Sequence, residues 1–212
     1  MNKPGNKLPL PYDCILLAAG ESKRMGSEHK LLLPFKGKPL FLHALSTALA
    51  ACRRVVLVEG AVKLSSILKE YGLANQVKLA TNNRYAEGQL GSLQCGLKAA
   101  QTDWVFVMLG DLPFVPASVF ALLYEHAEGR ESVMPKELHR TAGAVLPVYS
   151  NNSPSGHPVL LGPSAIKLVH AAKPDDRIKH VIEPSGPRYV DCSNSNITND
   201  VDTPEAYKRL QG

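Results

Sequence analysis

The stretch that decides the fold is LLAAGESKRMGSEHKLLLPFKGKPL, residues 16–40. It opens as an apolar strand and changes at Gly20 into a loop that carries Arg24 and Lys30 among small and polar residues. The stretch ends where Pro39 begins a run of apolar residues at helical spacing. A strand, a glycine-containing loop and a helix in this order are typical of the first unit of a parallel α/β sheet.

The same alternation of strand and helix continues along the chain. The patterns predict strands at 13–19, 54–58, 76–81, 104–109, 141–149, 157–161 and 188–192. They predict helices at 39–52, 63–71, 90–101, 116–127, 163–172, 175–182 and 203–210. Several of the strands are apolar on both faces, as in parallel sheets that helices cover. We therefore predict an α/β fold with a Rossmann-like, doubly wound, mostly parallel sheet.

Length and composition indicate one globular domain. The 212 residues, 44% hydrophobic and 20% charged, are enough to bury a core without disulfides or structural metals. We predict a flexible tail for residues 1–12 and a single domain for residues 13–212. The tail lacks the apolar core of a secretory signal, and no apolar run approaches the roughly 20 residues of a membrane helix. A cytoplasmic location is expected, with the four cysteines as buried free thiols.

The net charge of +5 is concentrated near the start of the chain. The first sixty residues contain nine lysines and arginines against four acidic residues, and the remainder balances. A nucleic-acid-binding protein usually carries its excess along one face with aromatic residues between the cations. This distribution favours a small polyanion as the partner and argues against nucleic acid.

The loop after the first strand is a candidate phosphate site. Gly20 and Gly26 allow backbone conformations that place amides toward an anion, and Arg24 and Lys30 add positive charge. Neither the P-loop pattern nor G-x-G-x-x-G occurs there. On composition alone, an ordinary solvated surface loop is the alternative.

Carboxylates follow the most hydrophobic strand and recur near the C-terminus. Gly110 and Asp111 come directly after residues 104–109, at the sheet edge where ligands bind in open parallel sheets. Asp111 could hold Mg²⁺ together with substrate phosphates, or it could cap the following turn. Asp200 and Asp202 would point the same way if residues 200–202 were extended, so either could be a second metal ligand.

Five motifs in order along the chain carry a resemblance to a known family. They are residues 16–40 as quoted above, AEGQLGSLQCGL (86–97), VMLGDLPFV (107–115), SGHPVLL (155–161) and DVDTPEAY (200–207). Together they resemble the molybdenum cofactor nucleotidyltransferase family, especially its cytidylyltransferase branch. The resemblance spans about residues 13–207.

This resemblance implies roles for particular residues. Those that would bind the nucleotide are Ala18, Ala19, Gly20, Gly26, Gly88 and Ser92. Arg24 and Lys30 would bind phosphates, and Asp111 would hold Mg²⁺ beside the segment of Asp200 and Asp202. His157 would face the acceptor, although a structural role in a turn is the alternative. Residues 174–179, PDDRIK, replace the G-D-x-G-A-R stretch that is common in the cytidylyltransferases.

The implied reaction transfers a nucleoside monophosphate from an NTP to a phosphorylated acceptor and releases pyrophosphate. The A-A-G sequence at residues 18–20 is similar to that of members that use CTP, and a molybdopterin-type acceptor with a molybdenum hydroxylase as client would follow. One alternative is a cytidylyltransferase for methylerythritol phosphate or a sugar phosphate. Another is a non-catalytic, cofactor-binding chaperone for molybdenum hydroxylases.

Overall fold

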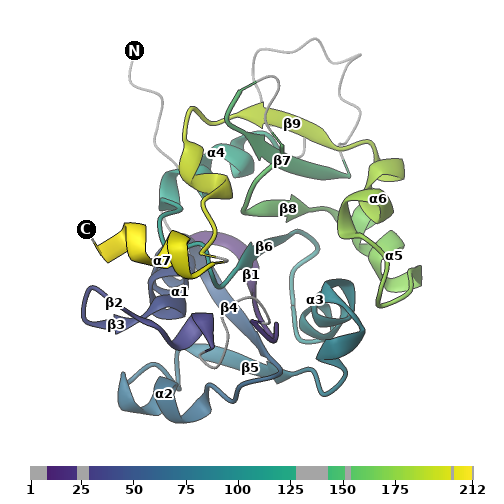
Figure 1. Cartoon of the computed structure of the whole chain (residues 1–212). Coiled ribbons are helices and arrows are strands. Elements are labelled where there is room, and N and C mark those ends of the chain that lie inside the picture. Colours follow the sequence, from purple (N-terminus) through teal and green to yellow (C-terminus); the bar gives the residue numbers. More distant parts are fainter. Residues whose placement is uncertain (1–8, 23–28, 128–142, 151–153, 202, 212) are drawn as a thin grey trace.

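The computed structural model of the chain describes residues 9–22, 29–127, 143–150, 154–201 and 203–211 (Figure 1). Its main element is a seven-stranded sheet in the order β5-β4-β1-β6-β8-β7-β9. The strands are β1 (Leu10–Ala18), β4 (Cys52–Glu59), β5 (Val77–Thr81), β6 (Val105–Leu109), β7 (Ala144–Val148), β8 (Val159–Leu161) and β9 (Arg188–Asp191). The short strands β2 (Pro34–Phe35) and β3 (Lys38–Pro39) form a separate antiparallel pair.

Helices cover both faces of the sheet. The α-helices are α1 (Leu40–Ala51), α2 (Ser65–Glu70), α3 (Gln89–Leu97), α4 (Ala117–Glu125), α5 (Pro163–Ala171), α6 (Ile178–Ile182) and α7 (Pro204–Gln211). Short 3-10 helices are η2 (Lys30–Leu32), η3 (Tyr85–Glu87), η5 (Glu183–Ser185) and η6 (Ser195–Thr198). One apolar cluster joins a face of the sheet to α1, α2 and α4, and a second joins the opposite face to α3, α5 and α6. The predicted doubly wound sheet is thus confirmed.

The central strand β1 organises these two clusters. It runs parallel to both β4 and β6, with Leu16 level with Leu57 on one side and Met108 on the other. Successive β1 side chains alternate between the two clusters, so that Leu16 packs under α1 and Ile15 under α3. Burial of each such side chain stabilises the fold by roughly 2 kcal/mol.

The strand begins earlier than the sequence predicted. Leu10 and Tyr12 belong to β1 and are buried, and the Tyr12 ring stacks on Trp104 at 6.3 Å. The last three residues of the predicted tail therefore belong to β1, and two of them, Leu10 and Tyr12, contribute to the core. Residues 1–8 lie outside the described part of the chain.

The second half of the sheet contains one reversed strand. β8 pairs antiparallel with both β6 and β7, whereas β9 runs parallel to β7. Only β8 is antiparallel to its neighbours in this sheet, among the residues that the structure describes. The prediction of a mostly parallel sheet is therefore confirmed. None of the helices in the described ranges is long and apolar enough to cross a membrane.

Two local predictions need correction. Cys14 and Cys52 are buried free thiols as expected, but Cys95 and Cys192 are only half-buried. Helix α6 begins at Ile178 and not at residue 175, because the Asp176 carboxylate accepts a hydrogen bond from the Lys173 amide at 2.8 Å and closes a turn there.

Candidate active site

The carboxyl ends of β1 and β6 border a cavity of about 320 Å³. Its lining includes most of the residues that the sequence singled out for nucleotide binding and catalysis, namely Ala18, Ala19, Gly20, Lys30, Gly88, Ser92 and Asp111. Neighbouring parallel strands end at the same edge of a sheet, so residues far apart in the sequence meet there. We call this space the nucleotide cavity.

An ion pair joins two of these predicted residues. The Lys30 ammonium at the start of η2 donates a hydrogen bond to Asp111 Oδ2, just beyond β6. The other carboxylate oxygen, Oδ1, is buried and accepts no hydrogen bond from any residue that the structure describes. Within those residues Asp111 does not cap the following turn, which removes the structural alternative for this side chain.

The buried Asp111 Oδ1 fits the requirement of a hard cation for an oxygen ligand. No three His, Cys, Asp or Glu side chains gather into a metal site in the described parts of the chain. A cation at Asp111 would therefore draw its remaining ligands from phosphates, water or the Asp200 segment.

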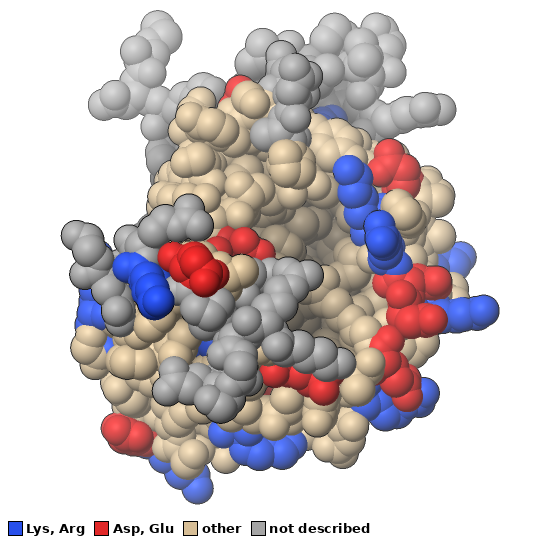
Figure 2. All heavy atoms as spheres, viewed as in Figure 1, with Lys and Arg blue, Asp and Glu red and all other residues tan. Residues whose placement is uncertain are grey.

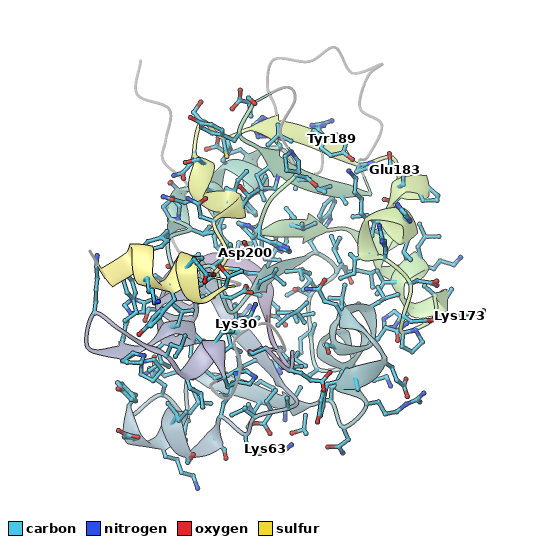
Figure 3. The ribbon with its side chains drawn as sticks, viewed as in Figure 1. Lys30, Lys63, Lys173, Glu183, Tyr189 and Asp200 are labelled. Carbon is cyan, nitrogen blue, oxygen red and sulfur yellow. The ribbon has the colours of Figure 1, made fainter. Side chains whose placement is uncertain are left out.

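The segment that contains Asp200 lies beside Asp111, as the sequence predicted. The Val201 amide donates a hydrogen bond to the Asp111 carbonyl oxygen at 3.2 Å, and the Val201 side chain is buried. Figure 3 labels Asp200 on the chain that leads into α7, near Lys30 in the view. Asp200 and Val201 belong to an irregular connection between η6 and α7 and not to a strand, so the argument from an extended pair has no support in the described residues. Asp202 lies outside the described residues.

The ends of the loop after β1 are held together by His29, which the sequence did not single out. His29 Nε2 donates a hydrogen bond to the Gly20 carbonyl oxygen at 2.7 Å, and the Lys30 amide donates one to Ser22 Oγ at 3.2 Å. Burial lowers the pKa of His29, an effect that the nearby Lys30 reinforces, so the ring is neutral near pH 7. Arg24 and Gly26 lie outside the described residues.

A second cavity of about 460 Å³ adjoins the first. Gln89, the first residue of α3, lines both cavities. The second cavity is bordered by His157 and by the segment from Asp175 to Lys179. Figure 2 shows a hollow in this face of the molecule with basic side chains along its edge, and Arg177 and Lys179 are among the lining residues.

His157 lines the second cavity and is also held by the fold. Its Nδ1 donates a hydrogen bond to the Val107 carbonyl oxygen at 3.2 Å, which ties it to β6. Burial lowers the pKa of His157, against the opposing effects of this hydrogen bond and of Asp111. The ring is therefore neutral near pH 7, with Nε2 as a hydrogen-bond acceptor.

The two cavities share a wall where two chain segments touch. Gly88 has a φ of 144°, and a Cβ at this position would overlap the Pro174 carbonyl oxygen. The same oxygen accepts a hydrogen bond from the Gly91 amide at 3.2 Å. Only glycine permits this approach, so the start of α3 and the segment before α6 are packed together.

Comparisons with known proteins agree with this geometry. Residues 14–191 match the MobA-like NTP transferase domain. Molybdenum cofactor cytidylyltransferase of Escherichia coli is 28% identical over 197 residues, which are 92% of this chain and 93% of that protein. Nicotine blue oxidoreductase of Paenarthrobacter nicotinovorans is 30% identical over 209 residues, covering 92% of this chain and 94% of its own.

A solved structure has the same fold. A nucleotidyl transferase from Methanothermobacter superposes with a TM-score of 0.74 at 19% identity and covers 93% of this chain and 94% of its own. The family match extends over most of the chain and includes residues 14–18 of β1, Lys30, Asp111 and His157. The chain therefore belongs to the MobA-like NTP transferase domain family, a family of nucleotidyltransferases.

Proposed function

We propose that the protein transfers CMP from CTP to a molybdopterin-type acceptor that carries a phosphate, and releases pyrophosphate. The observation that carries this proposal is the Lys30–Asp111 pair at a nucleotide-sized cavity that adjoins a second cavity through Gln89. Transfer between two phosphate-bearing substrates requires two neighbouring sites and positive charge where they meet. The preference for CTP rests on the Ala18-Ala19-Gly20 sequence, and a molybdenum hydroxylase would be the client of the product.

The chemistry needs no strong base. An oxygen of the acceptor phosphate, already anionic near pH 7, attacks the α-phosphorus of CTP and forms a new P–O bond. The bond from the α-phosphorus to the bridging oxygen of the β-phosphate breaks, and pyrophosphate leaves with those electrons. Lys30 supplies positive charge to the phosphates, and Arg24 is proposed to do the same from the loop after β1.

Mg²⁺ is the proposed cofactor. Asp111 would hold it through Oδ1, with Asp200 or Asp202 as a second carboxylate ligand. When bound, the ion would neutralise phosphate charge and orient the triphosphate. The bound ion would replace Lys30 as the positive partner of the Asp111 carboxylate. The Lys30 ammonium would then be available to bind a phosphate.

The second cavity is the proposed acceptor site. His157 offers a neutral ring with Nε2 as an acceptor, and Arg177 and Lys179 are the cations of a lining that also contains Asp175 and Asp176. These two cations would hold a second anionic group of the acceptor, at a distance from the phosphate that reacts.

A redox reaction is the second candidate, because one relative that covers most of the chain is named an oxidoreductase. Hydride transfer generally requires a nicotinamide or flavin cofactor, and the two adjoining cavities have room for two ring systems. The ion pair of Lys30 and Asp111 favours phosphate transfer, since a redox reaction has no need of a carboxylate at the phosphates.

The deciding experiment measures pyrophosphate release. CTP, GTP, ATP and UTP are each incubated with molybdopterin-type cofactor or methylerythritol phosphate, with Mg²⁺ or with EDTA. Release that requires CTP, the molybdopterin-type acceptor and Mg²⁺ is expected. Release with methylerythritol phosphate alone would assign the other acceptor, and nucleotide binding without any release would favour a chaperone. Oxidation of NADPH or NADH by the purified protein in the presence of a dye, without release, would favour the redox candidate.

A further inference from the structure

A buried polar network backs the nucleotide cavity at the end of β5. Asn82 follows this strand directly, and only 8% of its surface is exposed. Its side-chain Nδ2 lies 3.0 Å from Ser92 Oγ, and its Oδ1 lies 2.9 Å from the Arg84 amide nitrogen. Ser92 is buried too, and it lines the nucleotide cavity from α3.

The hydrogen bond with the Arg84 backbone amide distinguishes the oxygen from the nitrogen of the Asn82 side chain. The Arg84 amide can only donate a hydrogen bond, so the Asn82 atom that it contacts must be the carbonyl oxygen. The opposite end of the side chain is then the NH₂ group, which can only donate. Ser92 Oγ therefore accepts a hydrogen bond from Asn82, and this direction does not depend on a choice between two equivalent side-chain orientations.

The Ser92 hydroxyl proton must consequently point away from Asn82. No acceptor among the residues that the structure describes takes a hydrogen bond from it, including the carbonyl groups of the preceding helical turn. Because Ser92 lines the nucleotide cavity, its proton is available to a bound molecule. A buried donor of this kind has a strong preference for a partner, because leaving it unpaired costs about 1–3 kcal/mol.

The position of Asn82 is itself rigidly held. Its amide donates a hydrogen bond to the Glu59 carbonyl oxygen at 2.9 Å, and the Glu59 carboxylate accepts one from Thr81 Oγ1 at 2.9 Å. Glu59 is 3% exposed and sits at the end of β4. These hydrogen bonds connect the ends of β4 and β5. They hold the backbone of Asn82 in place, and with it the position from which its side chain reaches Ser92.

We propose that Asn82 is a positioning residue that holds Ser92 as a hydrogen-bond donor to an acceptor atom of the nucleobase. The inference rests on the proposed function, because it assumes that a nucleotide fills this cavity. Tyr85 and Ala86 line the same wall and provide the aromatic and apolar surface that a base requires. Lys30 and Asp111 line the same cavity and would hold the phosphates. Asn82 would then influence which base is accepted without touching it.

The sharpest test is an isosteric substitution that reverses the hydrogen bond. In Asn82→Asp, one oxygen still accepts from the Arg84 amide, while the other replaces the NH₂ group and accepts from the Ser92 hydroxyl. Ser92 then presents a lone pair to the cavity and no proton. The Kd for CTP, measured by calorimetry at about pH 8 where the new carboxylate is ionised, is expected to rise about tenfold.

Two controls separate this effect from the added charge. Inorganic triphosphate, which has no base, is expected to bind Asn82→Asp as it binds the wild type. In the double variant with Ser92→Ala, the Asp substitution is expected to cause no further loss of CTP affinity relative to Ser92→Ala alone. Thermal unfolding of each variant checks that the fold is retained.

The outcomes are distinct. Wild-type affinity for CTP in a folded Asn82→Asp variant would overturn the inference. An equal loss in the presence and absence of the Ser92 hydroxyl would also overturn it, because charge or misfolding would then be the cause. A wild-type protein that binds no nucleotide would overturn the proposed function as well, whereas normal CTP binding and turnover in Asn82→Asp would overturn this inference alone.

Discussion

Lys30 and Asp111 form an ion pair although 81 positions of sequence separate them. One residue follows the first strand and the other follows the strand beside it, so the parallel arrangement of β1 and β6 brings them together. The pair thus connects the positively charged loop after β1 with the carboxylate that follows β6. Perturbing either partner should therefore affect phosphate chemistry and leave the core intact.

The first prediction concerns Asp111→Asn. This change keeps the shape of the side chain but removes the charge that Lys30 and the proposed Mg²⁺ require. We expect kcat/KM for pyrophosphate release to fall by about a thousandfold, since loss of one transition-state electrostatic contact typically costs two to three orders of magnitude. The matched control is Asp103→Asn at the exposed opposite end of β6, which should retain full activity. Equal activity of the two variants would contradict the assignment.

The second prediction concerns the contact of Gly88 with Pro174. Gly88→Ala would place a methyl group against a backbone oxygen at a positive φ, so we expect a loss of more than about 2 kcal/mol in unfolding free energy and a raised KM for CTP. Gly72 has a φ of 67° with open space around it. Gly72→Ala should therefore cost only about 1 kcal/mol and leave KM unchanged. Denaturant titration and initial rates measure both quantities, and similar losses in the two variants would refute the role of the Pro174 contact.

The third prediction concerns Glu59, a buried carboxylate that accepts two hydrogen bonds and forms an ion pair with Lys63 at 3.4 Å. Its oxygens accept hydrogen bonds from the Leu64 amide at 2.8 Å and from Thr81 Oγ1 at 2.9 Å. In Glu59→Gln, the amide oxygen can still accept from the Leu64 amide, but the NH₂ group replaces the charged oxygen that Thr81 and Lys63 contact, so we expect a loss of about 1–3 kcal/mol in the free energy of unfolding. Glu70→Gln, on the exposed end of α2, is the control and should be neutral. The midpoint of urea unfolding reports both, and an unchanged midpoint for Glu59→Gln would contradict the prediction.

The fourth prediction concerns pH. Burial lowers the pKa of His43 below its ordinary value of 6.5, and Lys38 and Lys36 add to this effect, while the hydrogen bond to the Phe35 carbonyl oxygen opposes it. As pH falls below 6.5, the unfolded chain binds a proton at His43 more readily than the folded chain does. The free energy of unfolding should therefore decrease with falling pH.

His43→Gln isolates this contribution. The variant should show a shallower decrease of unfolding free energy between about pH 7 and pH 5, because one proton-binding difference is gone. His170→Gln, exposed on α5, should keep the wild-type dependence. Parallel curves for wild type and His43→Gln would show that His43 makes no contribution.

Much of the fold could be predicted because strong local patterns agree with it. The apolar run at β1 and the strand β6, which contains Phe106 and Met108, are buried in parallel positions, as their composition indicates. Thr203 also caps α7 as predicted, since its Oγ1 accepts a hydrogen bond from the Ala206 amide at 3.1 Å. The reversed direction of β8 has no such local signal, because an antiparallel partner is chosen by tertiary pairing.

Only the residues that line the cavity could be predicted from the sequence, and not the residues that hold them in place. Lys30 and Asp111 follow strands, so their meeting could be derived from the order of the strands. Asn82 and His29 act through contacts with Ser92 and Gly20, and nothing in a local pattern reveals the partner of a buried polar side chain. Such residues become visible only when hydrogen bonds are traced atom by atom.

Gln89 stands between the two cavities, and this has a kinetic consequence. Each substrate of the proposed reaction would occupy one cavity, but the joined product would extend across the Gln89 boundary into both. Such a product is expected to compete with the nucleotide and the acceptor alike, and to be retained more tightly than either. Turnover would then be limited by departure of the product, and a client protein that draws it out of both cavities would accelerate the whole cycle.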